Sequence, residues 1–432
     1  MKLTIHRRTH QIGGCVTEIE SNGFRVFIDF DEELPGALTN DLNPITGLTS
    51  GDVARSALFI THYHGDHIGK ICDANPELPI YAGETATEIF KTLENRLSYI
   101  PDPIESAKRK QIVERIKTIR PFHALQEIKV GEICVTPLLV DHSAFDAYMF
   151  IVEAENIRIL HTGDFRGHGF RSKGLLPTLR KYATDIDFII SEGTNISKPD
   201  AALKSEHLLQ KDFEGYFRKY KYNFVLVSST NIDRLFSLYH AAKFAQRCFV
   251  CDGYQAGILR YVSSRHKQFT PFYDIDFDQK SNPAGRFFDL KRRGKEPLTF
   301  DGRLKSYLDR YGFCMPIRST DLFKSITDEY HKSDESKVYY SMWNGYLDNT
   351  KTAFNKSLYD FIMPYNPVYL HTSGHTGAEK LAAVFDTVKP KQGIIPIHTE
   401  HPEAFKKKFP DYCVILLKDK EVFEVKGVMR LG

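Results

Sequence analysis

The sequence predicts an α/β protein with two domains, and three observations support this prediction. With 432 residues the chain is longer than a single hydrophobic core usually organises. Its first third is rich in expected strands, whereas the roughly 180 residues after Glu192 alternate strand, polar turn and helix. The hydrophobic share of 42% is ordinary for a globular protein. We therefore expect a parallel sheet in the second domain.

The first elements are expected to form a β-hairpin followed by helices. Residues 15–20 and 24–30 are apolar stretches that flank Asn22-Gly23, a dipeptide that favours the tight turn of a hairpin. Residues 84–120 mix Leu and Ile with Lys and Arg, which predicts helix. The sequence Pro101-Asp102-Pro103 predicts a break within this helical region.

A histidine-rich run follows the apolar residues 57–60. Residues 61–67 read THYHGDH, so three imidazoles and one carboxylate fall within six residues. This set of nitrogen and oxygen ligands suits Zn²⁺ and similar ions better than Ca²⁺ or Mg²⁺. A strand would carry the chain to the edge of a sheet, and a loop containing glycine would then turn alternate side chains toward one point.

The spacing within this run divides its ligands into two groups. His62 and His64 are two residues apart and can share one ion, while Asp66 and His67 point toward a second. The run therefore predicts a two-metal hydrolase site. The alternative is that these are scattered polar residues of a loop.

Several later strands also end in polar residues, and their order along the chain is the specific signal. These residues are Asp141 and His142 after residues 135–140, Asp164 after residues 157–160, Glu192 after residues 187–191, and His398 after residues 394–397. A further apolar stretch ends in residues 371–375, which read HTSGH.

The histidine run and these later residues resemble the metallo-β-lactamase fold hydrolases. The resemblance implies an αββα sandwich with two metal ions, Zn²⁺ with Mn²⁺ as the alternative. It assigns His62, His64 and His142 to the first ion, Asp66, His67 and His398 to the second, and Asp164 to a bridge between them. In that family an acidic residue at the position of Asp29 orients the histidine loop without touching the metal. As the alternative, an Asp at a strand end is often only a turn residue.

Glu192 and the HTSGH run resemble two sequence signatures of the β-CASP branch of this superfamily, and His398 fits a third signature. Members of this branch process nucleic acids. The branch includes ribonuclease J-like and cleavage-and-polyadenylation endonuclease-like proteins, and it carries an inserted parallel α/β domain. We therefore expect a metallo-β-lactamase domain over residues 1–197, the β-CASP insertion over 198–366, and completion of the first domain over 367–432. Because the chain ends at Gly432, we expect a short form without the C-terminal domain of ribonuclease J-like enzymes.

The resemblance implies a two-metal phosphodiester hydrolase that acts as a ribonuclease. A 5′-exonuclease is one form of this activity. It implies that Asp66, Glu192 and His375 are catalytic. His375 would protonate the leaving oxygen, and Glu192 would orient the His375 ring. Ser229, His371 and Ser373 would bind a substrate phosphate. The expected partner is RNA, single-stranded by preference, or DNA. Two alternatives remain: a hydrolase of a small ester or lactam, and a nucleic-acid-binding scaffold without activity.

Composition limits the remaining possibilities. The net charge of +3 argues against a protein that coats nucleic acid by bulk charge, and the basic clusters at 291–295 and 406–408 are more typical of solvated faces. No segment has the apolar length of a membrane span or the core of a signal peptide, so we expect a cytoplasmic protein and leave its oligomeric state open. The seven cysteines suit reduced thiols, and Cys248 and Cys251 are interpreted as buried strand residues.

Aromatic residues are frequent in residues 263–335, which have no clear periodicity. Phe287, Phe288, Tyr307 and Tyr311 could stack nucleic-acid bases, but aromatics at this spacing more often belong to a core. Trp343, the only tryptophan, is expected to have a packing role alone.

Overall fold

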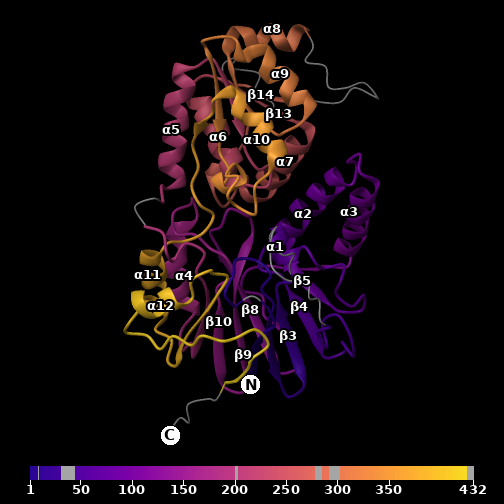
Figure 1. Ribbon diagram of the computed structural model, residues 1–432, viewed down its shortest axis with the longest axis vertical. Coiled ribbons are helices and arrows are strands. Elements are labelled where there is room, and N and C mark those ends of the chain that lie inside the picture. Colours follow the sequence, from indigo (N-terminus) through magenta and orange to yellow (C-terminus); the bar gives the residue numbers. More distant parts are fainter. Residues whose placement is uncertain (8, 31–43, 200–202, 278–284, 291–301, 426–432) are drawn as a thin grey trace. The chain divides into compact units, whose positions relative to one another are not determined.

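The computed structural model describes residues 1–7, 9–30, 44–199, 203–277, 285–290 and 302–425. The chain divides into two compact units: a first unit of Met1–Leu203 with Gly374–Gly432, and a second unit of Lys204–Ser373. The second unit is therefore an insertion between two parts of the first. Figure 1 shows the elements of both units.

The first unit is built on two β-sheets. Among the described residues, the first sheet has seven strands in the order β19-β1-β2-β3-β4-β5-β6, and the second has six in the order β18-β11-β10-β9-β8-β7. The strands of the first sheet are β1 (Lys2–Ile5), β2 (Thr17–Ser21), β3 (Phe24–Ile28), β4 (Ser56–Phe59), β5 (Ile80–Gly83), β6 (Arg120–Phe122) and β19 (Val422–Glu424). Those of the second are β7 (Ile128–Val130), β8 (Ile133–Val140), β9 (Ala147–Ala154), β10 (Ile157–His161), β11 (Phe188–Glu192) and β18 (Gly393–Ile397).

These two sheets pack face to face and carry helices outside. Buried side chains such as Phe59 of the first sheet and Phe150 of the second meet in one apolar cluster. The other face of the second sheet is covered by α4 (Leu175–Tyr182), α11 (Ala378–Val388) and α12 (Glu403–Lys408), which lie together in Figure 1. At the first sheet, α2 (Glu84–Leu97) contacts β5 and β6, and α3 (Pro103–Ile116) packs on α2. The order helix, sheet, sheet, helix fits a metallo-β-lactamase-like fold.

Local sequence signals in the first unit are confirmed. β2 and β3 form the expected antiparallel hairpin, and Asn22 and Gly23 at its turn have φ of 48° and 78°, as a tight turn with two left-handed residues requires. The helical region breaks where Pro103 starts α3, and Asp102 caps this helix by accepting hydrogen bonds from the backbone N–H groups of Ile104 and Glu105.

The second unit contains the expected parallel sheet. Among the described residues its strand order is β14-β13-β15-β12-β16-β17, and each described pair is parallel. The strands are β12 (Tyr222–Leu226), β13 (Cys248–Asp252), β14 (Phe287–Leu290), β15 (Phe313–Ile317), β16 (Ser336–Tyr340) and β17 (Val368–Tyr369). The helices are α5 (Glu206–Lys219), α6 (Ile232–Phe244), α7 (Gly253–His266), α8 (Gly302–Tyr311), α9 (Asp321–His331) and α10 (Lys356–Ile362). Cys248 and Cys251 are buried in β13, as predicted.

Two strands, β14 and β15, and both boundaries of the insertion differ from the sequence-based expectation. The second unit begins at Lys204 and ends at Ser373, whereas the insertion was expected over 198–366. β15 lies in the region without periodicity, because a parallel strand that is buried on both faces shows no alternation of apolar and polar residues. Residues 367–373 were assigned to the first domain, but β17 pairs with β16, and the Thr372 hydroxyl donates to the Lys204 carbonyl (2.5 Å). Backbone pairing therefore places this segment in the second unit.

The four aromatic residues considered for base stacking are part of the core of the second unit or pack against it. Phe287 is buried, and Phe288, Tyr307 and Tyr311 pack against the core of the second unit. The structure therefore favours the packing interpretation over base stacking for these four rings. Of the two basic clusters, Lys406–Lys408 is exposed at the end of α12, whereas residues 291–295 lie outside the described residues.

Candidate metal centre

One end of the first unit gathers the predicted site residues because several strands point the same way. In the second sheet β10, β11 and β18 are mutually parallel, and β8 runs in the same direction because β9 is antiparallel to both β8 and β10. Their carboxyl ends therefore meet at one edge. These ends supply His142 after β8, Asp164 after β10, Glu192 at the end of β11 and His398 after β18, and β4 of the first sheet leads into His62.

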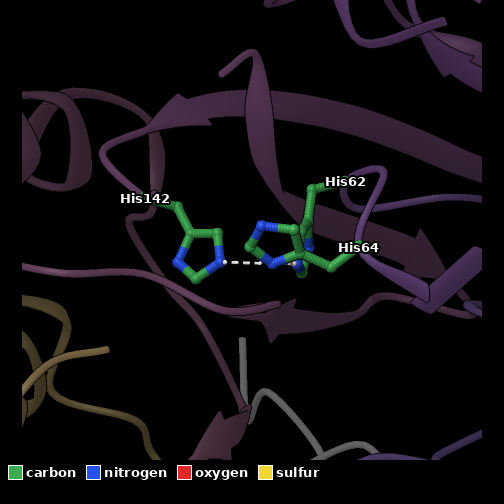
Figure 2. A group of neighbouring side chains, drawn as sticks. All are labelled: His62, His64 and His142. Atoms are coloured by element: carbon green, nitrogen blue, oxygen red, sulfur yellow. Dashed lines mark hydrogen bonds between the residues drawn. The ribbon is translucent and has the colours of Figure 1, made fainter. Parts of the chain in front are cut away.

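Three histidines form the first candidate ligand group. His62 Nε2 lies 3.1 Å from His64 Nδ1, and His142 Nε2 lies 3.3 Å from the same His64 nitrogen. Figure 2 shows the three rings converging from the two loops. Burial lowers the pKa of His64 to about 4 and holds the pKa values of His62 and His142 well below their usual range. The three imidazoles are therefore neutral at pH 7, which is the form that binds metal.

These spacings fit a shared metal ion. Four ligands at 2.0–2.1 Å from a tetrahedral ion lie about 3.3–3.4 Å apart, close to the two ring-nitrogen distances observed. The donor set of three histidines is one that zinc sites use, with a fourth position left for water or substrate.

The second candidate group contains Asp66, His67 and His398. Residues Gly65–Ile68 form a single helical turn, α1, where sequence reasoning placed a loop, and this turn directs consecutive side chains to different sides. One ligand atom from each of the three residues lies within 4.8 Å of the others. His398 Nε2 is 3.6 Å from Asp66 Oδ2.

Asp164 lies between the histidines of the site. Its Oδ2 accepts a hydrogen bond from His67 Nε2 at 3.0 Å and lies 3.5 Å from His375 Nδ1, while its Oδ1 is 3.6 Å from His398 Nδ1. Burial opposes ionisation, but the surrounding imidazoles hold the pKa of Asp164 well below its usual range. An Asp164 oxygen also lies within 4.8 Å of ligand atoms of His62 and His67, so the carboxylate is close to a member of each group. Its bridging role stays a prediction.

His398 supports a bound cation in two further ways. Its Nε2 atom is buried and has no hydrogen-bond partner among the described residues. Its backbone adopts φ of 49°, a left-handed conformation that is uncommon for a residue other than glycine. A strained backbone of this kind persists where surrounding contacts hold the residue in that conformation, often at functional sites. A metal ion would satisfy the nitrogen that the fold directs inward.

Asp29 fixes the orientation of the histidine run. It accepts hydrogen bonds from the backbone N–H of Thr61 (2.7 Å), from the Thr61 hydroxyl (2.8 Å), and from His67 Nδ1 (2.8 Å). Because Asp29 accepts from Nδ1, Nε2 is the ring nitrogen that faces Asp164 and the cluster, and a bound metal ion would take the place of its proton. Asp29 thus has the contacts that the predicted orienting role requires.

Replacing Asp29 by asparagine is expected to weaken metal binding about 10- to 100-fold, since an amide holds His67 less firmly in the required tautomer. Isothermal titration of the metal-free protein with Zn²⁺ measures this. The matched control is Asp146→Asn, because Asp146 is also buried with a left-handed backbone (φ 64°) but binds Tyr148 and the N-terminus of α2. Equal losses in both variants would assign Asp29 a general structural role.

His375 and Glu192 form a pair beside the ligand groups. His375 Nδ1 donates to Glu192 Oε2 at 3.0 Å, so the ring presents its Nε2 elsewhere. Burial opposes protonation, but the carboxylates of Glu192 and Asp164 raise the pKa of His375 to about 9. The His375 side chain is 20% exposed, whereas those of His67 and His398 are 4% and 1% exposed. Of these three rings, His375 is the one that a substrate can reach.

No family model matches the chain. The chain is 22% identical over 394 residues to ribonuclease J of Helicobacter pylori (strain ATCC 700392 / 26695), an alignment that covers 86% of this chain and 52% of that protein. It is 23% identical over 358 residues to ribonuclease J of Mycoplasma genitalium, covering 80% of this chain and 57% of the relative. The chain is similar to ribonuclease J over most of its own length. It spans about half the length of the curated relatives it matches.

Two further comparisons concern the metallo-β-lactamase-like fold. Lactamase-like protein nscB of Aspergillus fumigatus is 28% identical over 200 residues, which cover 45% of this chain and 49% of that protein. The crystal structure of a protein of unknown function from Enterococcus faecalis V583 matches with a TM-score of 0.71 and 20% identity, covering 98% of this chain and 99% of that chain. This match shows a fold shared along nearly the whole of both chains. Among the described helices, none has both the length and the apolar character needed to cross a membrane.

Sequence reasoning missed the groups that orient two of the histidines. His142 Nδ1 donates to the Gly374 carbonyl at 2.7 Å, which leaves its Nε2 lone pair toward His64. A Cβ at Gly374 would lie 2.3 Å from Ser143 Oγ, so glycine allows this close approach. Thr194 Oγ1 lies 3.0 Å from His398 Nδ1. The sequence signal for Gly374 is its place in HTSGH, between Ser373 and His375.

The predicted phosphate-binding residues all lie in the second unit. Ser229 follows β12, and its hydroxyl accepts hydrogen bonds from Gln255 Nε2 (3.1 Å) and Arg318 Nη1 (3.4 Å). His371 and Ser373 lie in the segment that follows β17. A common phosphate pocket formed by these three residues stays a prediction.

Proposed function

We propose that this ribonuclease J-like chain is a two-metal phosphodiester hydrolase of the β-CASP type that acts on RNA. The observation that carries the proposal is the pair of adjacent ligand groups, with Asp164 between them and the Glu192–His375 pair at their side. The similarity to ribonuclease J and to a lactamase-like protein supports the same class of chemistry. The inserted second unit supports a β-CASP type over a single-domain lactamase-like enzyme.

Each candidate ligand has a proposed role. His62, His64 and His142 would hold one ion, and Asp66, His67 and His398 the other, with Asp164 shared; Zn²⁺ suits these donors, and Mn²⁺ is the alternative. Bound metal ions would supply Lewis-acid activation of the attacking water and neutralise charge at the phosphoryl group.

His375 is the proton donor in this proposal. The leaving 3′-oxygen needs a proton, and a general acid must present one from a position that substrate can reach. Glu192 binds Nδ1 of the ring and so fixes its plane, which leaves Nε2 as the donating atom. Products would carry a 5′-phosphate and a 3′-hydroxyl.

One set of incubations tests this function. RNA and DNA oligomers of one sequence, labelled at either end and carrying a 5′-monophosphate or a 5′-hydroxyl, are incubated with the wild-type protein in Zn²⁺ or Mn²⁺. We expect metal-dependent cleavage of single-stranded RNA, and none by the Asp164→Ala protein. A chromogenic lactam serves as the competing substrate. Hydrolysis of the lactam without cleavage of any oligomer would favour the small-ester or lactam alternative.

The same experiment examines the end of the substrate. If Ser229, His371 and Ser373 hold a terminal phosphate, 5′-monophosphorylated RNA is degraded faster than 5′-hydroxyl RNA, and mononucleotides accumulate from that end. Cleavage of a circular RNA at the rate of the 5′-monophosphate form would exclude a terminal pocket. The enzyme would then be an endonuclease.

A further inference from the structure

Three aromatic rings are exposed together on the second unit. Trp343, Tyr346 and Tyr369 are 44%, 37% and 50% exposed, and we call these three residues the aromatic platform. Large aromatic side chains are usually buried in a core, so a group of them at the surface indicates a binding site.

The fold holds the platform in a defined arrangement. The Trp343 and Tyr346 rings meet edge to face, with centroids 5.4 Å apart at 79°. Tyr340 joins the two segments, because its hydroxyl donates to the Trp343 carbonyl (2.9 Å) and its ring stacks with that of Tyr369 at 6.1 Å and 25°. The backbone of Asn344 also interacts with the Tyr369 hydroxyl. The platform is therefore one surface made from residues of two segments.

Gly345 leaves room for the indole ring of Trp343. A Cβ at this position would lie 2.4 Å from two carbons of the Trp343 ring. The indole therefore packs against the bare backbone of Gly345, which limits the conformations it can take. A ring that is positioned before binding loses less conformational entropy when a ligand stacks on it.

We propose that the aromatic platform stacks the bases of single-stranded nucleic acid. This inference rests on the proposed function and deepens it by naming the contact that recognises the substrate strand. Every base offers a flat π-face, so exposed aromatic rings bind single strands without regard to sequence. A duplex keeps its bases stacked on one another and offers no such face.

Charge favours nucleic acid over an apolar protein partner. In residues 204–373 the excess of Lys and Arg over Asp and Glu is larger than the net charge of +3 of the whole chain. The remaining residues therefore carry a net negative charge. A basic unit attracts a polyanion and orients it before close contact forms. Tyr369 also belongs to the continuous segment that leads through His371 and Ser373 to His375, the proposed proton donor.

The single tryptophan provides a direct measurement, since Trp343 is the only source of indole fluorescence in the chain. The Asp164→Ala protein in chelator is titrated with oligouridylate, with an abasic ribose-phosphate oligomer of equal length, and with blunt duplex RNA. We expect oligouridylate to quench the fluorescence in a saturable way, and the other two to leave it nearly unchanged. Equal effects of oligouridylate and the abasic oligomer would overturn the proposal, because they would show binding through phosphates alone.

Variants locate the contact. Tyr369→Ala and Gly345→Ala should each weaken oligouridylate binding roughly 5- to 100-fold, the range for one stacked base, although Gly345→Ala removes no ring. Tyr369→Phe keeps the ring and should bind as the parent does. Phe269→Ala is the matched control, because Phe269 is 75% exposed in the same unit but outside the platform. Circular dichroism checks that each variant is folded; unchanged binding in folded Tyr369→Ala and Gly345→Ala would overturn the proposal.

The outcomes separate this inference from the proposed function. RNA cleavage by the wild type without base-dependent quenching would refute the platform and leave the nuclease. Base-dependent quenching without cleavage under any metal condition would support the platform and refute the proposed nuclease activity. A fluorescence change that follows protein concentration alone, with dimers in sedimentation, would identify the platform as a self-association surface and overturn the proposal.

Discussion

The Asp164→Ala protein is expected to lose most of its bound metal and to lose RNA cleavage completely. The Asp164 carboxylate lies 3.0 Å from His67 and 3.6 Å from His398 of the second ligand group. It also lies within 4.8 Å of a ring nitrogen of His62 in the first group, so both groups are close to its charge. Its removal takes a negative charge out of the centre of a buried site, which weakens cation binding more than the loss of any one neutral histidine. Elemental analysis of protein purified in Zn²⁺ measures the metal content.

The matched control is Asp187→Ala. Asp187 is likewise buried in the first unit, but it accepts hydrogen bonds from the backbone N–H of Arg158 and from the side chain of Gln392, away from the ligand groups. This variant should keep the metal content of the wild type. Two full metal equivalents in Asp164→Ala would contradict the assignment of Asp164 to both ions.

The His375→Ala protein is expected to keep its metal and to cleave RNA about 10²- to 10⁴-fold more slowly, the usual range for loss of a general acid. His375 binds Glu192 through Nδ1 and is more exposed than the buried histidines, so its removal changes proton delivery more than metal binding. A phosphodiester with a p-nitrophenolate leaving group needs no protonation, and its hydrolysis should be nearly unaffected.

His401→Ala serves as the control, since His401 is exposed in the loop after His398 and should tolerate replacement. Glu192→Gln should slow RNA cleavage in the same direction as His375→Ala but by less, because the ring remains and only its orientation weakens. Equal losses on RNA and on the activated phosphodiester in His375→Ala would point to a structural role for this histidine.

Much of the fold was predictable where the signal is local. The Asn22-Gly23 hairpin and the start of α3 at Pro103 depend on residues close together in the chain. The parallel sheet of the second unit was predictable because strand, turn and helix alternate along the chain. β15 was missed because a strand buried on both faces has no alternating pattern. The boundary near residue 366 was displaced because pairing between β16 and β17, which no local pattern shows, assigns the segment.

The aromatic residues show the same division. Nothing in their spacing distinguishes Tyr307 and Tyr311, which pack against a core, from Trp343 and Tyr369, which are exposed. Sequence reasoning considered base stacking for the first pair but favoured core packing, and it expected only packing for Trp343. Exposure is a property of the folded surface, since it depends on which distant segments cover a side chain.

The sequence by itself identified which residues to expect at one site, because each candidate ligand either lies in the run of residues 61–67 or directly follows an apolar strand. Strand direction then brings these positions to a common edge, which sequence order alone can anticipate. The tertiary structure decided their chemistry: which nitrogen of His142 and His67 faces the cluster, and that Asp164 faces three rings. The carbonyl that fixes His142 belongs to Gly374, 232 residues away, and no local pattern encodes a contact between residues so far apart in the chain.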